Sequence, residues 1–297
     1  MYPIPTKTLC LATAILVILG IAGFISFFAF RDTFSLVYWR IRYFRLPRAT
    51  GSGPKEIVPK TENGVAVSLV GISEKEWQVS RKWVPPSQKA LITTDTVLVA
   101  LGCWWDDSYS LTAPPIDSNG SFSNSVSRTV DLAHAPVQTH IWHQSRPATG
   151  EHLITPRSVG ARGDGFFLVL KIEGIDQKSP IRTTGQARLA HALVGANDPN
   201  SIQSITVSTD AAAAQVGDLA VAIFTVDACD NADIKMDSPE GWTSIGSNSV
   251  AIQNLGYRAC CRVVTKEGPQ AATCRWRDNS SFAAEATLVI FKRTSTL

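Results

Sequence analysis

The side chains with the clearest chemical potential form an aromatic and acidic cluster. The cluster follows the apolar segment 97–101 and comprises Trp104, Trp105, Asp106, Asp107 and Tyr109. Aromatic rings beside carboxylates are typical of loops that bind sugars, and exposed Trp and Tyr side chains are common anchors of protein interfaces. We therefore predict a loop here that binds carbohydrate or a protein partner. Packing that only anchors the loop to the core is an equally good explanation.

Four of the five histidines are close together in the sequence, at His134, His140, His143 and His152. With the two acids of the cluster they could hold a divalent ion or serve a hydrolase, and His143 and His152 are expected to face each other across a hairpin. Nothing in the spacing fixes a third metal ligand, so exposed positions on a sheet explain these histidines better. We predict neither a metal nor another cofactor.

Sequence motifs of catalysis are absent from the chain. It contains no Gly-x-Ser-x-Gly, no phosphate-binding loop and no His-Glu-x-x-His. Arg162-Gly163-Asp164 matches an integrin-binding tripeptide, but ordinary turns use the same residues. After residue 55 the chain carries 21 basic and 24 acidic residues, so we do not expect the basic face that nucleic-acid binding requires. These features favour a protein that is not an enzyme and has no nucleic-acid partner.

Three of the six cysteines are placed for a cross-strand disulfide. A hairpin that turns near Glu267-Gly268 would bring Cys274 opposite Cys260 or Cys261. Such a pair forms a disulfide only with suitable geometry and in an oxidising compartment. The alternative is that all three are small buried thiols in a reducing compartment, which is common for cysteine.

The N-terminal segment is apolar enough to cross a membrane. Leu9 to Phe30 is a run of 22 residues without a charge, which as a helix spans a hydrocarbon core of about 30 Å. A cleaved signal peptide would need small residues near its end, where this run has Phe27, Phe28 and Phe30. We therefore predict that residues 1–30 form a short tail and a retained single transmembrane helix, with the lipid bilayer as partner.

Residues 31–63 follow as a basic, aromatic juxtamembrane stem and linker. Aromatic side chains anchor at the level of the lipid headgroups, and arginines there attract anionic lipid. Five arginines follow the apolar run, whereas only Lys7 and the amino terminus precede it. The positive-inside rule therefore places the C-terminal part on the cytoplasmic side. The residues that we assign to the membrane interface are Trp39, Arg40, Arg42, Tyr43 and Arg45.

The remaining chain contains an internal repeat. Asp95 begins an apolar segment that matches the one beginning at Asp218, and each copy ends in another apolar segment, at Leu170 and Phe291. Leu170 follows Asp95 by 75 positions, and Phe291 follows Asp218 by 73. Short alternating segments with Gly, Pro, Asn and Ser between them are typical of antiparallel β-sandwiches. We predict a mainly β protein with two tandem, duplicated modules, residues 64–180 and 181–297; one fused sandwich fits nearly as well.

The second copy contains four short motifs in a fixed order, which are Val216-Gly217-Asp218, Ser238-Pro239-Glu240-Gly241-Trp242, Arg262-Val263-Val264 and Cys274-Arg275-Trp276. Over about 80 residues that contain these motifs, the copy resembles the β-sandwich modules of bacterial surface proteins and phage tail or virion proteins. The first copy departs from it, because Asp117-Ser118-Asn119-Gly120 stands where the Gly-Trp pair should be. The resemblance implies a binding or structural module and brings no catalytic residue with it.

Together these features predict a membrane-anchored, non-catalytic structural or adhesive protein. A phage virion or a bacterial envelope is the context that the resemblance implies. Protein, carbohydrate and a second copy of the chain are the candidate partners. The alternative is a membrane-anchored hydrolase that uses histidines and acids of the first module.

Overall fold

The computed structural model describes residues 55–59, 64–77, 87–93, 95–106, 114–126, 137–156, 163–190, 202–209, 214–228, 236–247, 255–277 and 281–295. All of them belong to one compact unit, Gly53–Leu297, which contains both predicted modules. This part of the chain is built from antiparallel β-strands, so the mainly β prediction is confirmed. No helix within it is long and apolar enough to cross a membrane. Residues 1–54, which hold the predicted transmembrane helix and most of the predicted stem and linker (31–63), lie outside the described ranges. Within that predicted linker, Lys55–Val58 form a strand, so the prediction of a linker is wrong for these residues.

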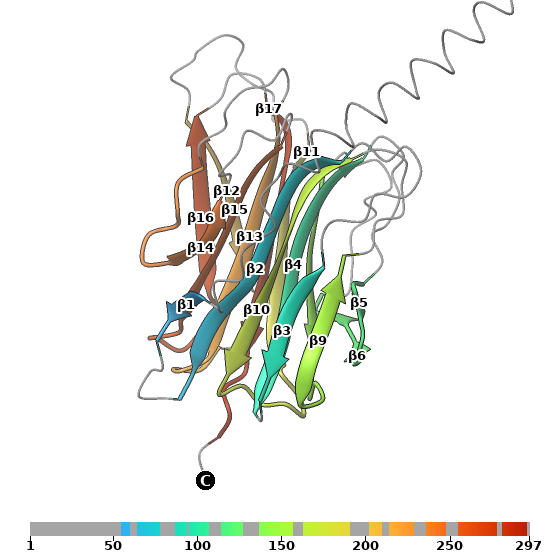
Figure 1. The fold of residues 1–297 in the computed structure, drawn as a ribbon. Helices are drawn as coiled ribbons and strands as arrows, with labels where there is room; N and C mark the ends of the chain where they lie inside the picture. The colour runs from blue at the N-terminus through green and yellow to red at the C-terminus, as the bar shows by residue number, and fades with distance from the viewer. Residues whose placement is uncertain are drawn as a thin grey trace, which may run out of the picture. The chain divides into compact units, whose positions relative to one another are not determined.

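Two central sheets make up most of the unit (Figure 1). The first central sheet has the order β1 (Lys55–Val58), β2 (Ala66–Trp77), β10 (Gly163–Glu173), β4 (Thr96–Asp106), β8 (Val137–Gln144) and β7 (Ser123–Asn124). The second central sheet has the order β11 (Ile181–Ala190), β17 (Ser281–Phe291), β13 (Leu219–Ala228), β15 (Leu255–Val263) and β14 (Thr243–Ser247).

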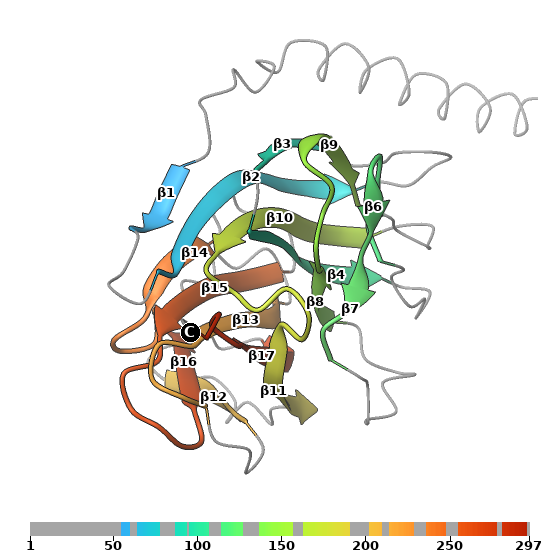
Figure 2. The same cartoon turned by 90° about the horizontal axis from the view of Figure 1, so that it is seen from below.

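Two smaller sheets cover the outer faces of the central sheets. The outer sheet consists of β3 (Gln88–Ile92), β9 (Gly150–Thr155), β5 (Ile116–Asp117) and β6 (Gly120–Ser121). The outer ribbon consists of β12 (Ile202–Ser208) and β16 (Ala271–Arg277). Figure 2 shows the resulting succession of layers, from β3 and β9 through the two central sheets to β16 and β12.

Side-chain alternation explains this layering. In β4, Val97, Val99 and Leu101 face the core between the central sheets, whereas Leu98 and Ala100 face the core under the outer sheet. Strand β13 divides in the same way: Leu219, Val221 and Ile223 lie in the middle core, and the residues under the outer ribbon are Ala220, Ala222, Phe224 and Val226. A strand that is buried on both faces is apolar at most of its positions. This is why the central strands are continuous apolar segments rather than alternating ones.

The two halves of the chain follow the same strand order. In the first half the order is β2-β10-β4-β8-β7, and in the second half it is β11-β17-β13-β15-β14. The pair β3 and β9 has its counterpart in β12 and β16. Strand β1 has no counterpart among the described residues of the second half.

When the two halves are aligned by their structure, the alignment differs by one residue from the one that the sequence gives. Val97 and Leu219 both face the middle core, and two residues before each of them the backbone has a positive φ, 62° at Asp95 and 91° at Gly217. Asp95 therefore corresponds to Gly217 and not to Asp218. A one-residue shift exchanges the two faces of a strand, which apolar residues on both faces conceal in the sequence.

Asp218 holds together the start of β13. Its fully buried carboxylate accepts hydrogen bonds from Arg182 Nε at 2.5 Å and from Arg182 Nη2 at 3.3 Å. The backbone N–H groups of Gln215 and Arg293 donate to the same carboxylate at 2.8 and 3.1 Å. A buried carboxylate is stable when it is paired and hydrogen-bonded, as here. Asp218 thus links β11, the turn before β13 and the segment after β17.

A second buried carboxylate joins the two central sheets. Glu285 of β17 accepts hydrogen bonds from the N–H and the hydroxyl of Thr139 in β8, at 3.2 and 2.9 Å. Because the Thr139 hydroxyl donates to Glu285, it accepts from Thr287 Oγ1 at 2.7 Å. Glu285 is only 3% exposed, so these bonds operate without competition from solvent.

We predict that Asp218→Asn lowers the free energy of unfolding by about 3 kcal/mol, because it removes one partner of a buried ion pair. Urea denaturation followed by circular dichroism measures the change. Asp237→Asn is the matched control, since this exposed side chain makes no hydrogen bond within the described residues. Equal stability of the two variants would contradict the role assigned to Asp218.

Candidate functional site

The predicted aromatic and acidic loop is in part a strand. Trp104, Trp105 and Asp106 are the last three residues of β4, and they pair with Gly165, Asp164 and Gly163 of β10. The prediction of a loop is therefore wrong for these three residues. The sheet extends further than expected because β10 continues the antiparallel ladder beside them. Asp107 and Tyr109 lie outside the described residues.

The described histidines of the first half, His140, His143 and His152, do not converge on one site. His152 is in β9 of the outer sheet, and its ring nitrogens lie 2.6 Å from Asp117 Oδ2 and 2.7 Å from the Ala148 carbonyl oxygen. Both side chains of the His152–Asp117 pair are fully buried, so the expected exposed position on a sheet is wrong for His152. His143 belongs to β8 of a different sheet, which makes the expected contact between His143 and His152 wrong.

His143 has a different partner. Its Nδ1 lies 3.0 Å from Ser125 Oγ, and partial burial lowers the pKa of the imidazole. His140, on the same strand, stacks on Trp142 with ring centroids 5.0 Å apart. Within the described residues no three His, Cys, Asp or Glu side chains are grouped so that they could hold a metal ion. His134 lies outside these residues.

The expected opposition of Cys274 to Cys260 or Cys261 is also wrong. Cys274 is opposite Ile205 in the outer ribbon, whereas Cys260 and Cys261 are in the second central sheet. The hairpin from β15 to β16 changes sheet at its turn, which the sequence spacing does not reveal. All three cysteines are free and buried. Burial raises the pKa of the Cys261 and Cys274 thiols to about 12 and that of the Cys260 thiol well above its usual value.

We predict that these three thiols do not react in the folded protein at pH 8, because a thiol with a raised pKa is not ionised at that pH. Iodoacetamide labelling followed by peptide mass spectrometry measures the modification at each cysteine. Labelling at all three sites is expected only after denaturation in urea. Rapid labelling of the folded chain, or a linked Cys274 peptide without reductant, would contradict the structure.

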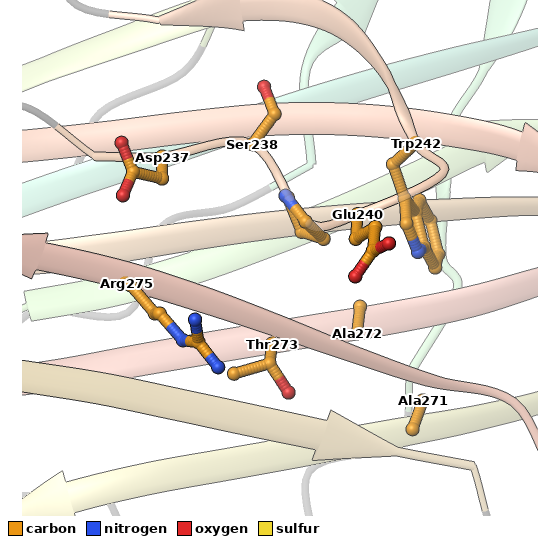
Figure 3. A pocket seen from close by; sticks show the side chains of 9 residues that line it. Asp237, Ser238, Glu240, Trp242, Ala271, Ala272, Thr273 and Arg275 are labelled. Atoms are coloured by element: carbon orange, nitrogen blue, oxygen red, sulfur yellow. The ribbon is translucent and has the colours of Figure 1, made fainter.

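A groove lies between the outer ribbon and the loop before β14. It has a volume of about 430 Å³, and Figure 3 shows the side chains that line it. One wall is strand β16 and the other is the segment 237–242. The lining residues are Asp237, Ser238, Pro239, Glu240, Trp242, Ala271, Ala272, Thr273 and Arg275.

A tight turn shapes the second wall of the groove. The Trp242 N–H donates to the Pro239 carbonyl at 3.1 Å, and Gly241 between them has a φ of 73°. A positive φ at the third position is typical of a type II turn and favours glycine there. Trp242 is then only 8% exposed, with the Arg262 guanidinium 4.7 Å from the centre of its ring. These contacts explain the Pro-x-Gly-Trp sequence.

The groove combines both charges with hydroxyl groups. Asp237 and Glu240 are exposed on the loop, and Arg275 is exposed on β16. Figure 3 shows Glu240 beside Trp242, and Arg275 beyond Thr273 along the strand. Sequence reasoning singled out the turn and the Cys274-Arg275-Trp276 segment but not the groove between them. The groove forms only because these two segments approach each other in the fold.

Comparison with known proteins adds no family. No family model matches the chain, and no curated protein matches it. Among solved structures, the chain is similar to a β-porphyranase of glycoside hydrolase family 86 from the human gut bacterium Bacteroides plebeius, with 10% identity and a TM-score of 0.21. The match covers 83% of this chain and 38% of that enzyme. A TM-score this low carries no argument about fold or activity.

Proposed function

We propose that the chain is a membrane-anchored, non-catalytic structural or adhesive protein that binds its partner through β-sandwich modules. The observation that carries this proposal is the groove of the outer ribbon. Its charged side chains, Asp237, Glu240 and Arg275, are exposed and line an open surface. Such a surface suits recognition of a macromolecule at the outside of a layered scaffold.

The scaffold itself is proposed to be a duplication, with modules at residues 64–180 and 181–297. The shared strand order of the two halves supports this proposal. The positive φ at Asp95 and at Gly217, at the same point before β4 and β13, supports it independently. In this proposal each module is one central sheet with its smaller sheet, and the two modules join through the middle core.

The membrane anchor is proposed to be the helix in residues 1–30, followed by the basic stem. The uncharged run from Leu9 to Phe30 supports an anchor, and the arginines after it support a cytoplasmic position for the modules. A phage virion or bacterial envelope remains the context that the sequence resemblance implies.

We predict that the full chain, tagged after Leu297, stays in the membrane pellet after a carbonate wash. In intact right-side-out vesicles the tag is expected to resist added protease, because the basic flank keeps the modules on the inner side of the membrane. The tag should become sensitive once detergent opens the vesicles. Immunoblotting measures both properties. Release by carbonate would overturn the anchor, whereas digestion without detergent would overturn only the orientation.

A hydrolase is the second candidate function, and one observation favours it. Ser125 Oγ lies 3.0 Å from His143 Nδ1, which is hydrogen-bond distance between a nucleophile and a base. The lowered pKa of His143 leaves its ring neutral near pH 7, as a general base requires. Against this candidate, Ser125 is only 7% exposed.

We predict that a fluorophosphonate probe does not label Ser125 at pH 7.5, because the hydroxyl is buried. In-gel fluorescence and peptide mass spectrometry measure labelling of the full chain. Labelling that is lost in Ser125→Ala and His143→Gln, but kept in Ser123→Ala on the exposed strand β7, would replace the binding proposal by the hydrolase.

A further inference from the structure

One edge of strand β16 opens into the groove. Along its other edge, β16 pairs with β12 over its full length. On the groove side it meets the segment before the turn in a single bridge, between Met236 and Trp276. Next to this bridge the Asp237 N–H donates to the Arg275 carbonyl at 2.8 Å. The Arg275 backbone therefore points into the groove and not toward β12.

Proline explains why the pairing stops there. Continuing the register from Met236 and Trp276 would place Pro239 opposite Thr273. Proline has no N–H to donate to a ladder, and the turn from Pro239 to Trp242 then leads the chain away from the strand. The groove occupies the space that a continued strand would have filled.

Thr273 consequently offers a free edge. Alternate residues of an antiparallel strand direct their N–H and C=O groups to the same side, so those of Thr273 point the same way as those of Arg275. Within the described ranges, the Thr273 N–H and C=O have no backbone partner on this side, and neither has the Arg275 N–H. Such an edge is a template for pairing with an added strand.

The charges along the groove indicate what such a strand carries. Asp237 and Glu240 stand on the loop wall, and neither forms an ion pair within the described part of the chain. These two carboxylates outnumber the one guanidinium of the lining, that of Arg275, so a basic side chain of a bound strand would complement the groove. The groove is less suited to a sugar, which would stack on an accessible aromatic ring. Trp242 is only 8% exposed, and Arg262 lies over its ring.

We propose that the groove binds an extended peptide segment of a partner protein, which adds as a strand to the edge of β16 at Thr273 and places a lysine or arginine beside Asp237 and Glu240. This inference rests on the proposed binding function and names its partner class. Main-chain hydrogen bonds to Thr273 supply the affinity, and the two carboxylates supply the selectivity.

The test uses the full chain in lipid nanodiscs and pools of acetylated, amidated heptapeptides. Each pool has a fixed central residue and random non-proline residues elsewhere. The central residue is Lys, Glu or a Lys that is methylated on its main-chain nitrogen. Mass spectrometry measures the peptides that the nanodiscs retain. We expect the Lys pool to be retained at least about tenfold over the other two, since one charge-assisted or main-chain hydrogen bond is worth about that factor. Equal retention of the three pools would overturn the proposal.

Variants then locate the binding. Thr273→Pro removes the N–H that faces the groove, and this N–H makes no hydrogen bond to β12. Glu240→Gln removes one of the two carboxylates. Each variant is expected to weaken retention of the Lys pool about tenfold or to abolish it. Thr273→Val keeps the N–H, and Glu267→Gln alters an exposed acid outside the groove lining, so both should retain the Lys pool. If Thr273→Pro alters the circular dichroism spectrum, the proposal is decided by comparing retention of the Lys pool by Glu240→Gln and by Glu267→Gln.

Two further measurements separate the inference from the proposed function. Hydrogen exchange of the segment 271–277 should slow when the best Lys peptide binds, and a panel of neutral oligosaccharides should be retained no better by the protein than by empty nanodiscs. Oligosaccharide retention that Glu240→Gln removes would overturn the peptide and leave a binding protein. Flotation of the chain with vesicles is measured in parallel, so loss of the anchor is recognised independently of peptide binding.

Discussion

Burial of both faces of the two central sheets is the constraint on which the rest of the structure depends. A strand such as β13 gains about 1.5–3 kcal/mol from each fully buried Val, Leu or Ile, whichever core the side chain enters. It can do so only if another layer covers each face. The first half supplies one cover, across the middle core, and the outer ribbon supplies the other. The buried carboxylates Asp218 and Glu285 are accommodated in this interior because both are hydrogen-bonded.

The groove is a consequence of that covering. A two-stranded ribbon is marginal by itself, and β12 and β16 are held by the side chains they bury on the second central sheet, Cys274 and Trp276 among them. One face of the ribbon therefore packs on the core, and one edge of β16 pairs with β12. Only the other edge remains, and Pro239 prevents the neighbouring segment from occupying it.

Sequence patterns predicted the class of fold but not its registers. Apolar segments, turn residues and the repeated landmarks predict antiparallel strands well, because each is a local property of a few neighbouring residues. Alignment of Asp95 with Asp218 failed by one residue, since a strand that is apolar on both faces has no polar side to mark its phase. Cys274 was misplaced because the hairpin before it changes sheets, and nothing local distinguishes such a turn. The groove was not predicted because its two walls lie 29 to 38 residues apart in the sequence, and no local pattern shows that they approach each other.

The position of the final strand has a consequence for synthesis of the chain on the ribosome. In the first half, β10 lies between β2 and β4, so that sheet can close once residue 173 has emerged. In the second half, β17 lies between β11 and β13, and that sheet cannot close before residue 291. At 5–20 residues per second, the nascent first half exposes Val97, Val99 and Leu101 to solvent for roughly 6–24 s. During that interval the chain is most accessible to chaperones and most prone to aggregate with other nascent chains on the same mRNA.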